Sequence, residues 1–433
     1  MQSFPKIANI LSHDPYIRTE SFMRKAVASV ATLLLGVAIL LAGQGLQIVL
    51  LPVRATLEQF SAFGVGYIGA FYFLGFTFGC WKGAELLRRV GHVRAFAAMT
   101  AIASAVPLLH GLWVNLWTWG IMRFATGFCF AVLYVVIESW LNERSTDENR
   151  GTVFSVYIVI NMTMIAVGQQ LLLLGDPLDL NLFAVASMVV SLAAVPVLMS
   201  RGEEPQQVEE SHFNLRLLYQ NSPSGMLGSF TSGVTNGGFW ALAPVFAVAA
   251  TQDVNMAAWF MTAGVLGGAV GQWPLGWWSD HVDRRIVLIT SCAAASGVGL
   301  ALWQLAPHIG ALGILGLGFC WGALAFPVYS VSVAQANDRA VPGTFVMISS
   351  GLLLMYGVGA VIGPLLSAGV MTLLGDQALF LFAAFGHLAL AVYVTARMRA
   401  EKEVEEVEHT EFSEALTSAL TTSPVYSKKV DHE

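Results

Sequence analysis

Residues 127–139 read GFCFAVLYVVIES, and residues 318–330 read GFCWGALAFPVYS. The two stretches align without gaps and share Gly, Phe, Cys, Leu and the closing Ser at an offset of 191 residues. Just downstream, RGTVF (150–154) and PGTFV (342–346) share Gly-Thr at an offset of 192. A similarity repeated at nearly one offset predicts that the chain contains two copies of one architecture.

Both stretches lie in long apolar segments, which recur along the whole chain. The chain has 433 residues, 56% of them hydrophobic, and a mean hydropathy of +0.65, which is well above that of a soluble domain. An apolar segment of roughly 17–25 residues is long enough to cross a bilayer. We predict twelve spans, at 27–50, 62–81, 95–113, 117–140, 152–174, 181–199, 224–250, 256–278, 286–305, 310–334, 344–373 and 377–396.

These spans must be helices, because the open edge of a strand cannot satisfy its backbone groups in lipid. Positive loops are retained in the cytoplasm, so the count of Lys and Arg by side predicts the orientation. With both termini inside, 20 of the 22 Lys and Arg lie on the cytoplasmic side, and only Arg54 and Arg123 do not. The predicted fold is an all-α polytopic membrane protein with cytoplasmic termini.

The longest polar interruption before the tail divides the chain after the sixth span. The tail itself carries five basic and nine acidic residues, so it accounts for −4 of the formal net charge of −6. We therefore expect a cytoplasmic N-terminal segment (1–26), an N-terminal six-helix domain (27–200), a cytoplasmic linker (201–223), a C-terminal six-helix domain (224–396) and an acidic cytoplasmic tail (397–433).

A charged patch follows the second span of the C-terminal half, where residues 276–285 read GWWSDHVDRR. Six plus six helices, a central linker and such a patch resemble the major facilitator superfamily of secondary transporters. The loop pattern of that family is roughly Gly-x-x-x-Asp-basic-x-Gly-basic-basic, and Gly276, Asp280, Arg284 and Arg285 match it. The counterpart in the N-terminal half, AELLRRVGHVR (84–94), keeps Gly91 and a basic cluster but not the Gly and Asp.

The segments RFATGFCFAVLYVVIESWLNERSTDENRG and FPVYSVSVAQANDRAVPGTFVMISSGLLLMYGVGAVIGP are also similar to the bacterial YcaD-like branch of this superfamily. The resemblance covers residues 27–396. It implies two pseudo-symmetric six-helix domains, a multi-pass location in the bacterial inner membrane and a transport function, but it does not imply a substrate.

Charged residues at the cytoplasmic helix ends are candidates for a gate. We expect Asp280 to accept hydrogen bonds from the N-terminus of a neighbouring helix, and Arg284 and Arg285 to pair with acids or helix C-termini. A solvated loop that only follows the positive-inside rule is the alternative. For Glu138 we expect a gate salt bridge, with proton carrying or a solvated helix end as alternatives; its candidate partners are Arg88, Arg89, Arg144 and Arg150.

Arg123 lies about two turns inside its span, where a charged side chain costs roughly 2.5–3.5 kcal/mol on insertion scales. It should therefore face protein or water, and Tyr134 falls near the same face of the helix. We expect this face to border a central cavity, so that Arg123 contributes to substrate binding or coupling. The alternatives are snorkelling to the outer surface and a structural pairing with a buried carbonyl.

Neutral polar and aromatic residues in other spans are further candidates for the cavity. They suit an uncharged or amphiphilic solute, although polar side chains also hold membrane helices together. The candidates are Gln44 and Gln47 on the first span, Asn236 and Trp240 on the seventh, Tyr329 on the tenth and Tyr356 on the eleventh.

Catalytic motifs give no competing prediction. The sequence GVGYIG (64–69) fits a nucleotide-binding pattern, but it lies inside a predicted span, where close helix packing explains it better. No Walker motif, metal-spaced His/Cys set or nucleophile elbow occurs. We expect no enzyme activity, no metal and no cofactor.

We predict a secondary active transporter that moves a small organic solute by alternating access, driven by a proton gradient, with efflux favoured over uptake. Its expected partners are the small-molecule substrate and membrane lipid, not nucleic acid, and we expect a monomer. An uncoupled facilitator or uptake permease is the alternative within this class. A membrane sensor or scaffold acting through the cytoplasmic tail is the alternative from another class.

Overall fold

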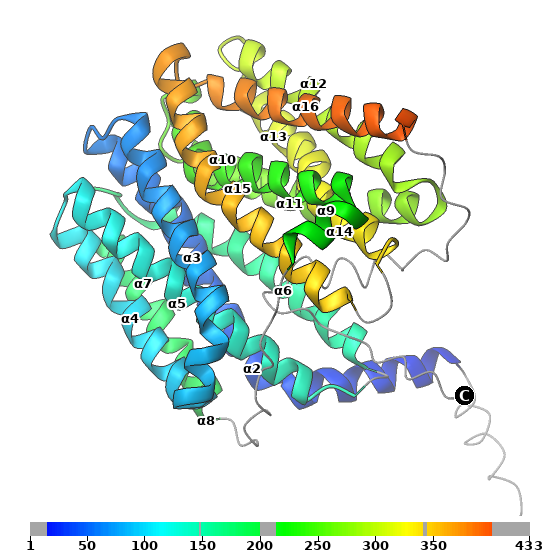
Figure 1. Cartoon of the computed structure of the whole chain (residues 1–433). Helices are drawn as coiled ribbons and strands as arrows, with labels where there is room; N and C mark the ends of the chain where they lie inside the picture. Colours follow the sequence, from blue (N-terminus) through cyan, green and yellow to red (C-terminus); the bar gives the residue numbers. More distant parts are fainter. Residues whose placement is uncertain (1–14, 147–148, 200–213, 341–343, 401–433) are drawn as a thin grey trace, which may run out of the picture.

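The computed structural model describes residues 15–146, 149–199, 214–340 and 344–400, and helices account for nearly all of them (Figure 1). No strand occurs within these ranges. The helices are α2 (Pro15–Leu57), α3 (Ala62–Val90), α4 (His92–Leu112), α5 (Leu116–Glu143), α6 (Arg150–Gln170), η1 (Leu171–Leu174), α7 (Leu180–Leu192), α8 (Ala194–Met199), α9 (Leu215–Asn221), α10 (Pro223–Thr251), α11 (Met256–His281), α12 (Arg284–Leu305), α13 (Ala311–Ala325), α14 (Pro327–Asn337), α15 (Phe345–Leu374) and α16 (Ala378–Ala400).

Eleven of the described spans are long and apolar enough to cross a membrane. They correspond to eleven of the twelve predicted spans. The remaining prediction, 256–278, falls on α11, which is 26 residues long but contains many glycines and tryptophans together with Gln272. These residues lower its hydropathy without preventing helix formation, because packing against neighbouring helices stabilises α11. The chain is an integral, multi-pass, all-α membrane protein.

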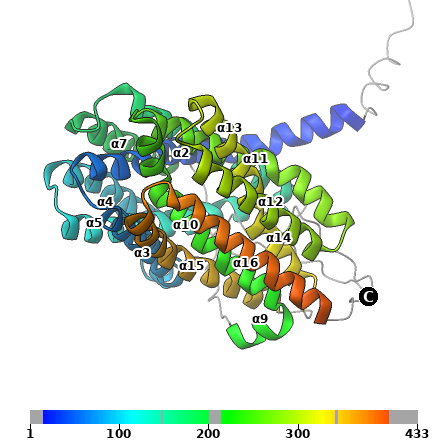
Figure 2. The same cartoon turned by 90° about the horizontal axis from the view of Figure 1, so that it is seen from above.

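The helices form two halves, α2–α8 and α10–α16, which lie side by side in both views (Figures 1 and 2). Each half contains one especially close helix pair, α3 with α5 and α11 with α13. A Cβ atom on Gly75 of α3 would lie 2.0 Å from the Phe124 carbonyl oxygen, and a Cβ on Gly267 of α11 would lie 2.0 Å from that of Phe319. Small residues therefore let the backbones touch in both halves. The two glycines lie 192 residues apart and their partners Phe124 and Phe319 lie 195 apart.

The predicted linker (201–223) falls partly outside the described residues. Its last part forms the short helix α9, which begins at the N-cap Asn214 and buries Leu218 against the C-terminal half. Ser222 then caps α10, and its hydroxyl accepts a hydrogen bond from the Gly225 amide at 3.3 Å. The predicted N-terminal segment (1–26) overlaps α2, which begins at Pro15, and the predicted tail (397–433) begins inside α16.

The two ends of the bundle differ in how the halves meet. We call the end where α2 gives way to α3 the far end, and the end where α3 gives way to α4 the linker end. At the far end a Cβ on Gly66 would lie 2.5 Å from the Pro364 carbonyl oxygen of α15, and one on Gly69 would lie 2.4 Å from the Ala241 Cβ of α10. The interpretation of GVGYIG as a helix-packing motif is thus confirmed, and it packs one half against the other.

Hydrogen bonds between α6 and α11 add to the far-end contact. The Gln170 amide donates to the Thr262 hydroxyl at 2.7 Å and to the Ala258 carbonyl at 3.2 Å. The Thr262 hydroxyl in turn donates to the Gln169 side-chain oxygen at 3.0 Å. These bonds join the halves through neutral groups, which exchange partners with water at little cost.

Candidate functional site

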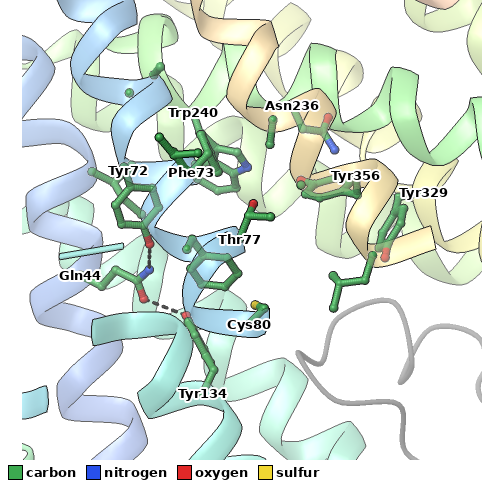
Figure 3. Close-up of a pocket in the computed structure, with 18 of the residues that line it drawn as sticks. Gln44, Tyr72, Phe73, Thr77, Cys80, Tyr134, Asn236, Trp240, Tyr329 and Tyr356 are labelled. Atoms are coloured by element: carbon green, nitrogen blue, oxygen red, sulfur yellow. Dashed lines mark hydrogen bonds between the residues drawn. The ribbon is translucent and has the colours of Figure 1, made fainter. Parts of the chain in front are cut away.

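A cavity of about 630 Å³ lies between the two halves at the centre of the bundle. Ligand pockets typically measure roughly 300–1,000 Å³, so its size suits a small organic molecule. Figure 3 shows part of its lining. The lining residues come from α2, α3, α5 and α6 on one side and from α10, α11, α14 and α15 on the other, with Phe326 at the junction of α13 and α14.

A chain of hydrogen bonds fixes the wall formed by the N-terminal half (Figure 3). The Tyr134 hydroxyl of α5 donates to the Gln44 side-chain oxygen of α2 at 2.7 Å. The Gln44 amide then donates to the Tyr72 hydroxyl of α3 at 2.8 Å. All three side chains are buried, so each bond orients its partner in a setting where an unmade bond is costly.

Arg123 lies on the same wall, two turns from the start of α5. Its side chain is only 8% exposed, and its guanidinium carbon lies 4.2 Å from the centroid of the Tyr72 ring. This distance is typical of a cation–π interaction. Arg123 is the one charged side chain among the described residues of the lining. No hydrogen bond or ion pair joins it to any residue within the described ranges.

The wall formed by the C-terminal half is aromatic and neutral. The rings of Trp240 and Phe326 are parallel, with centroids 5.7 Å apart, and those of Tyr329 and Tyr356 are 4.6 Å apart. Asn236 lies one turn before Trp240 on α10 (Figure 3). This wall therefore offers flat apolar surface and a few hydrogen-bonding groups to a solute.

The structure brings most of the predicted substrate residues together. Seven of the eight line the cavity, namely Arg123, Tyr134, Gln44, Asn236, Trp240, Tyr329 and Tyr356. Gln47 does not line it, and its amide donates instead to the Gly43 carbonyl of its own helix at 3.3 Å. Residues three apart on a helix lie about 60° apart around its axis, and this turn places Gln47 beside the part of α2 that faces the cavity rather than on it.

Several lining residues were not predicted from the sequence, above all Tyr72, Thr77 and Cys80 on α3 and Asn161 on α6. The sequence offers little signal for the first three. Their side chains spread over about 140° around α3, and the aromatic run around them resembles a surface that faces lipid. Asn161 is a single amide in an apolar stretch, which was a weaker signal.

The contacts of Gly66, Gly69 and Gln170 described above close the cavity at the far end. Toward the linker end the lining continues to Trp81 near the end of α3 and to Ser349 near the start of α15. The structure thus shows a state in which the central cavity extends from the closed far end toward the linker end.

The charged patch at the start of α12 forms a buried network at the linker end. Arg284 has a fully buried side chain, and its Nε donates to the Asp338 carboxylate at the end of α14 at 2.7 Å. Its other nitrogens reach the Asp280 carboxylate at 3.3 Å and the Ser279 hydroxyl at 3.3 Å. Arg284 therefore joins α11, α12 and α14, all of which belong to the C-terminal half.

Arg285 pairs locally with Asp283, the N-cap of α12. Its Nη2 lies 2.7 Å from the carboxylate, which also accepts the Arg285 backbone N–H at 2.9 Å. Partial burial raises the pKa of Asp283, but the hydrogen bonds and positive charge of Arg285 outweigh this effect, so the pKa lies below its ordinary value. The pair stabilises the turn between α11 and α12.

Glu138 lies on α5, one turn beyond Tyr134 toward the linker end. It is 1% exposed and accepts a hydrogen bond from the Tyr157 hydroxyl of α6 at 3.3 Å. Asn161 interacts with the side chains of both Tyr157 and Tyr134, which links the carboxylate to the cavity wall.

The basic candidates for the gate lie at the same end of the N-terminal half. Arg89, near the end of α3, pairs with Glu85 at 2.5 Å on an exposed surface. Arg88 precedes it on α3, and Arg150 is the first residue of α6. The structure therefore places these arginines at the helix ends where the sequence predicted the gate.

Two similar helical halves around a central cavity define a membrane transport protein, and the comparisons with known proteins agree. The profile of the Major Facilitator Superfamily matches residues 225–428. An uncharacterized MFS-type transporter of Enterobacter sp. (strain 638) is 29% identical over 348 residues, covering 77% of this chain and 87% of its own. The uncharacterized MFS-type transporter YcaD of Shigella flexneri is 27% identical over 340 residues, with the same coverage.

Solved structures share the fold at low sequence identity. The nucleoside transporter NupG superposes with a TM-score of 0.74 at 12% identity, covering 86% of this chain and all of its own. A bacterial homologue of the lysosomal transporter Spinster, in an inward-facing and occupied conformation, gives 0.65 at 14% identity, with 85% and 94% covered. The chain is thus similar in sequence to transporters of the major facilitator superfamily and shares their fold; these relatives are transporters, not enzymes.

Proposed function

We propose that this protein is a secondary active transporter that carries a small organic solute by alternating access. The observation that carries the proposal is the central cavity, which both halves line and which contacts between the halves close at the far end. Transport then requires a second state in which the far-end contacts separate and the linker end closes. The far-end contacts consist of glycines and neutral amides, so their separation leaves no buried charge without a partner.

The proposed driving force is a proton gradient, with Glu138 as the group that takes up the proton. Glu138 is the one fully buried acid among the side chains whose exposure the structure describes. Its contacts with Tyr157, and through Asn161 with Tyr134, connect it to the cavity wall. Protonation would remove a buried negative charge and thereby shift the balance between the two states.

The proposed direction is export from the cytoplasm across the bacterial inner membrane. This follows from the predicted orientation, in which the linker end is cytoplasmic and both termini lie inside. The cavity extends toward that end, which is the side where an exporter binds its solute.

Distances between spin labels on the two halves test alternating access without a known substrate. In a cysteine-free background reconstituted in liposomes, one pair of cysteines replaces Leu112 and Leu373, which are exposed at the far end. A second pair replaces Arg89 and His281 at the linker end. A change from about pH 8 to about pH 5 should lengthen one distance and shorten the other.

The matched variant is Glu138→Gln, which keeps the size of the side chain but cannot titrate. It should still populate both states while losing their pH dependence. If the wild-type protein populates both states but the two spin-label distances do not depend on pH, it is an uncoupled facilitator. Two fixed distances under all conditions would refute alternating access and favour a sensor or scaffold.

A further inference from the structure

We propose that the solute is a small organic anion with an aromatic or otherwise apolar body, and that Arg123 binds its anionic group. This assignment rests on the proposed transport function and narrows its substrate class. The carrying observation is a buried guanidinium on the cavity wall that has no hydrogen bond or ion pair within the described residues.

The other buried arginines show how unusual Arg123 is. Arg54 pairs with Glu58 at 2.8 Å and donates to backbone carbonyls of the loop before α7. Arg284 pairs with two carboxylates, and Arg285 with one. A buried charge without a partner is strongly destabilising, which is why buried arginines are normally paired. Arg123 has no such partner among the described residues, and it lines the cavity, so a solute in the cavity can supply the partner.

The Tyr72 ring prepares Arg123 for this role. The ring centroid lies 4.2 Å from the guanidinium carbon, and the Tyr72 hydroxyl accepts a hydrogen bond from Gln44. Gln44 is itself oriented by the hydrogen bond that it accepts from Tyr134. Within the described residues no hydrogen bond uses the N–H groups of Arg123. The planar fork of N–H donors therefore remains available for a carboxylate, sulfonate or phosphate.

The rest of the lining defines the body of the solute. No acidic side chain occurs among the described lining residues, so a cationic solute would meet Arg123 without any compensating charge. Trp240, Phe326, Tyr329 and Tyr356 provide aromatic surface on the opposite wall. One cation and an extended aromatic wall fit one anionic group attached to an apolar body.

Binding of naphthyl compounds that differ only in their head group tests this inference. Naphthoate, naphthalenesulfonate and naphthyl phosphate carry the anion, whereas naphthamide is neutral and naphthylmethylamine is cationic. Isothermal titration calorimetry on the detergent-purified full-length protein should give at least one anion an affinity about 10-fold to 100-fold above that of naphthamide, because hydrogen bonds to charged groups are the strong ones. Naphthylmethylamine should bind most weakly.

Three variants assign the preference to Arg123. Arg123→Gln should bind the preferred anion no better than naphthamide, and Arg123→Lys should retain part of the preference because it keeps the charge but not the fork. Arg54→Gln is the matched control: it removes a buried arginine that lies outside the cavity lining, and it should bind like the wild type. Size-exclusion profiles and melting curves without ligand confirm folding.

The inference is overturned if naphthamide binds as well as every anion, if no anion binds, or if Arg123→Gln keeps the preference. If Arg123→Gln fails to fold, two results still test the inference. They are the head-group preference of the wild type and the partial loss of that preference in Arg123→Lys. The spin-label distances judge the transport function separately. If the two spin-label distances change in opposite directions but no anion is preferred, only the proposed substrate class is refuted. If an anion binds but both distances stay fixed, transport is refuted and the site is an anion-binding site without a transport function.

Discussion

The fourth helix of one half and its counterpart in the other are built differently. In the N-terminal half α5 runs unbroken from Leu116 to Glu143, whereas the corresponding stretch divides into α13 and α14 at Pro327. At the offset of 191 residues, Ile314 stands in place of Arg123 and Tyr329 in place of Glu138. The two buried charges of α5 are therefore absent from its counterpart, so the duplicated fold does not require them.

At the linker end the distribution of buried charge is reversed, because here the C-terminal half holds the buried charge. The C-terminal half buries the network of Arg284, Asp280 and Asp338, whereas Arg89 and Glu85 pair on an exposed surface of the N-terminal half. What the halves share is the close packing of glycines. We conclude that the shared glycines build the fold, that the charges of α5 serve the cavity, and that those of the C-terminal half hold its helix ends together.

The largest effect should come from breaking the buried network. We expect Arg284→Gln to lower the free energy of unfolding by about 3–5 kcal/mol, because it removes a fully buried charge that pairs with the carboxylates of Asp280 and Asp338. Arg89→Gln, the matched change in the other half, should cost less than about 1 kcal/mol since the pair is exposed. Thermal unfolding in detergent measures both. Equal losses in the two variants would contradict the division of roles between the halves.

A middle-sized effect should come from the shared glycines. A Cβ on Gly127 of α5 would lie 2.0 Å from the Tyr72 carbonyl oxygen, whereas one on Gly316 of α13 would meet nothing within 4 Å. Gly127→Ala should therefore cost about 1–3 kcal/mol through overpacking against backbone. Gly316→Ala should be neutral or stabilise by up to about 1 kcal/mol. If Gly127→Ala left the melting temperature unchanged, the helices would be less closely packed than the structure shows.

The smallest effect concerns Asp283, whose pKa is lowered. A carboxylate with a lowered folded-state pKa contributes stability above about pH 4, and this contribution disappears as the pH falls through the lower folded value. Asp283→Asn keeps an N-cap but loses the charge, so it should cost about 0.2–1 kcal/mol at neutral pH.

The deficit of Asp283→Asn should shrink in strong acid and at high salt. Asp179→Asn is the control, because Asp179 precedes α7 without a side-chain cap hydrogen bond. Melting curves at several pH values compare the two variants. A deficit that stays constant with pH would assign the effect to the shape of the side chain rather than to its charge.

Much of the fold could be predicted from the sequence, because each span has to satisfy its own backbone in lipid. The predicted spans recover the helices to within a few residues at most ends, and the GVGYIG stretch packs as expected. The span predicted at 256–278 is recovered as α11 (Met256–His281) as well, although Gln272 and the glycines weaken its apolar signal. The first helix also extends beyond its predicted span, because the polar residues that flank a span can continue the same helix.

The site was predicted less completely. Arg123 and Tyr134 stood out because charge and polarity are costly inside a membrane. Tyr72, by contrast, is one aromatic residue among several in its segment, so its residue type does not single it out. Only its contacts with Gln44 and Arg123 reveal its role. The same applies to Asp338, which lies 54 positions from the arginine that it pairs with.

By itself the sequence determined the class of fold, the number of repeated halves and the positions where charge enters the membrane, because these depend on local hydropathy and on an offset within one chain. Only the tertiary structure decided which polar residues meet. It showed that Gln44 bridges two tyrosines, that carboxylates neutralise Arg284, and that no described residue neutralises Arg123. The physical reason is that pairing depends on how helices far apart in the chain rotate and pack against one another, and hydropathy does not record that rotation.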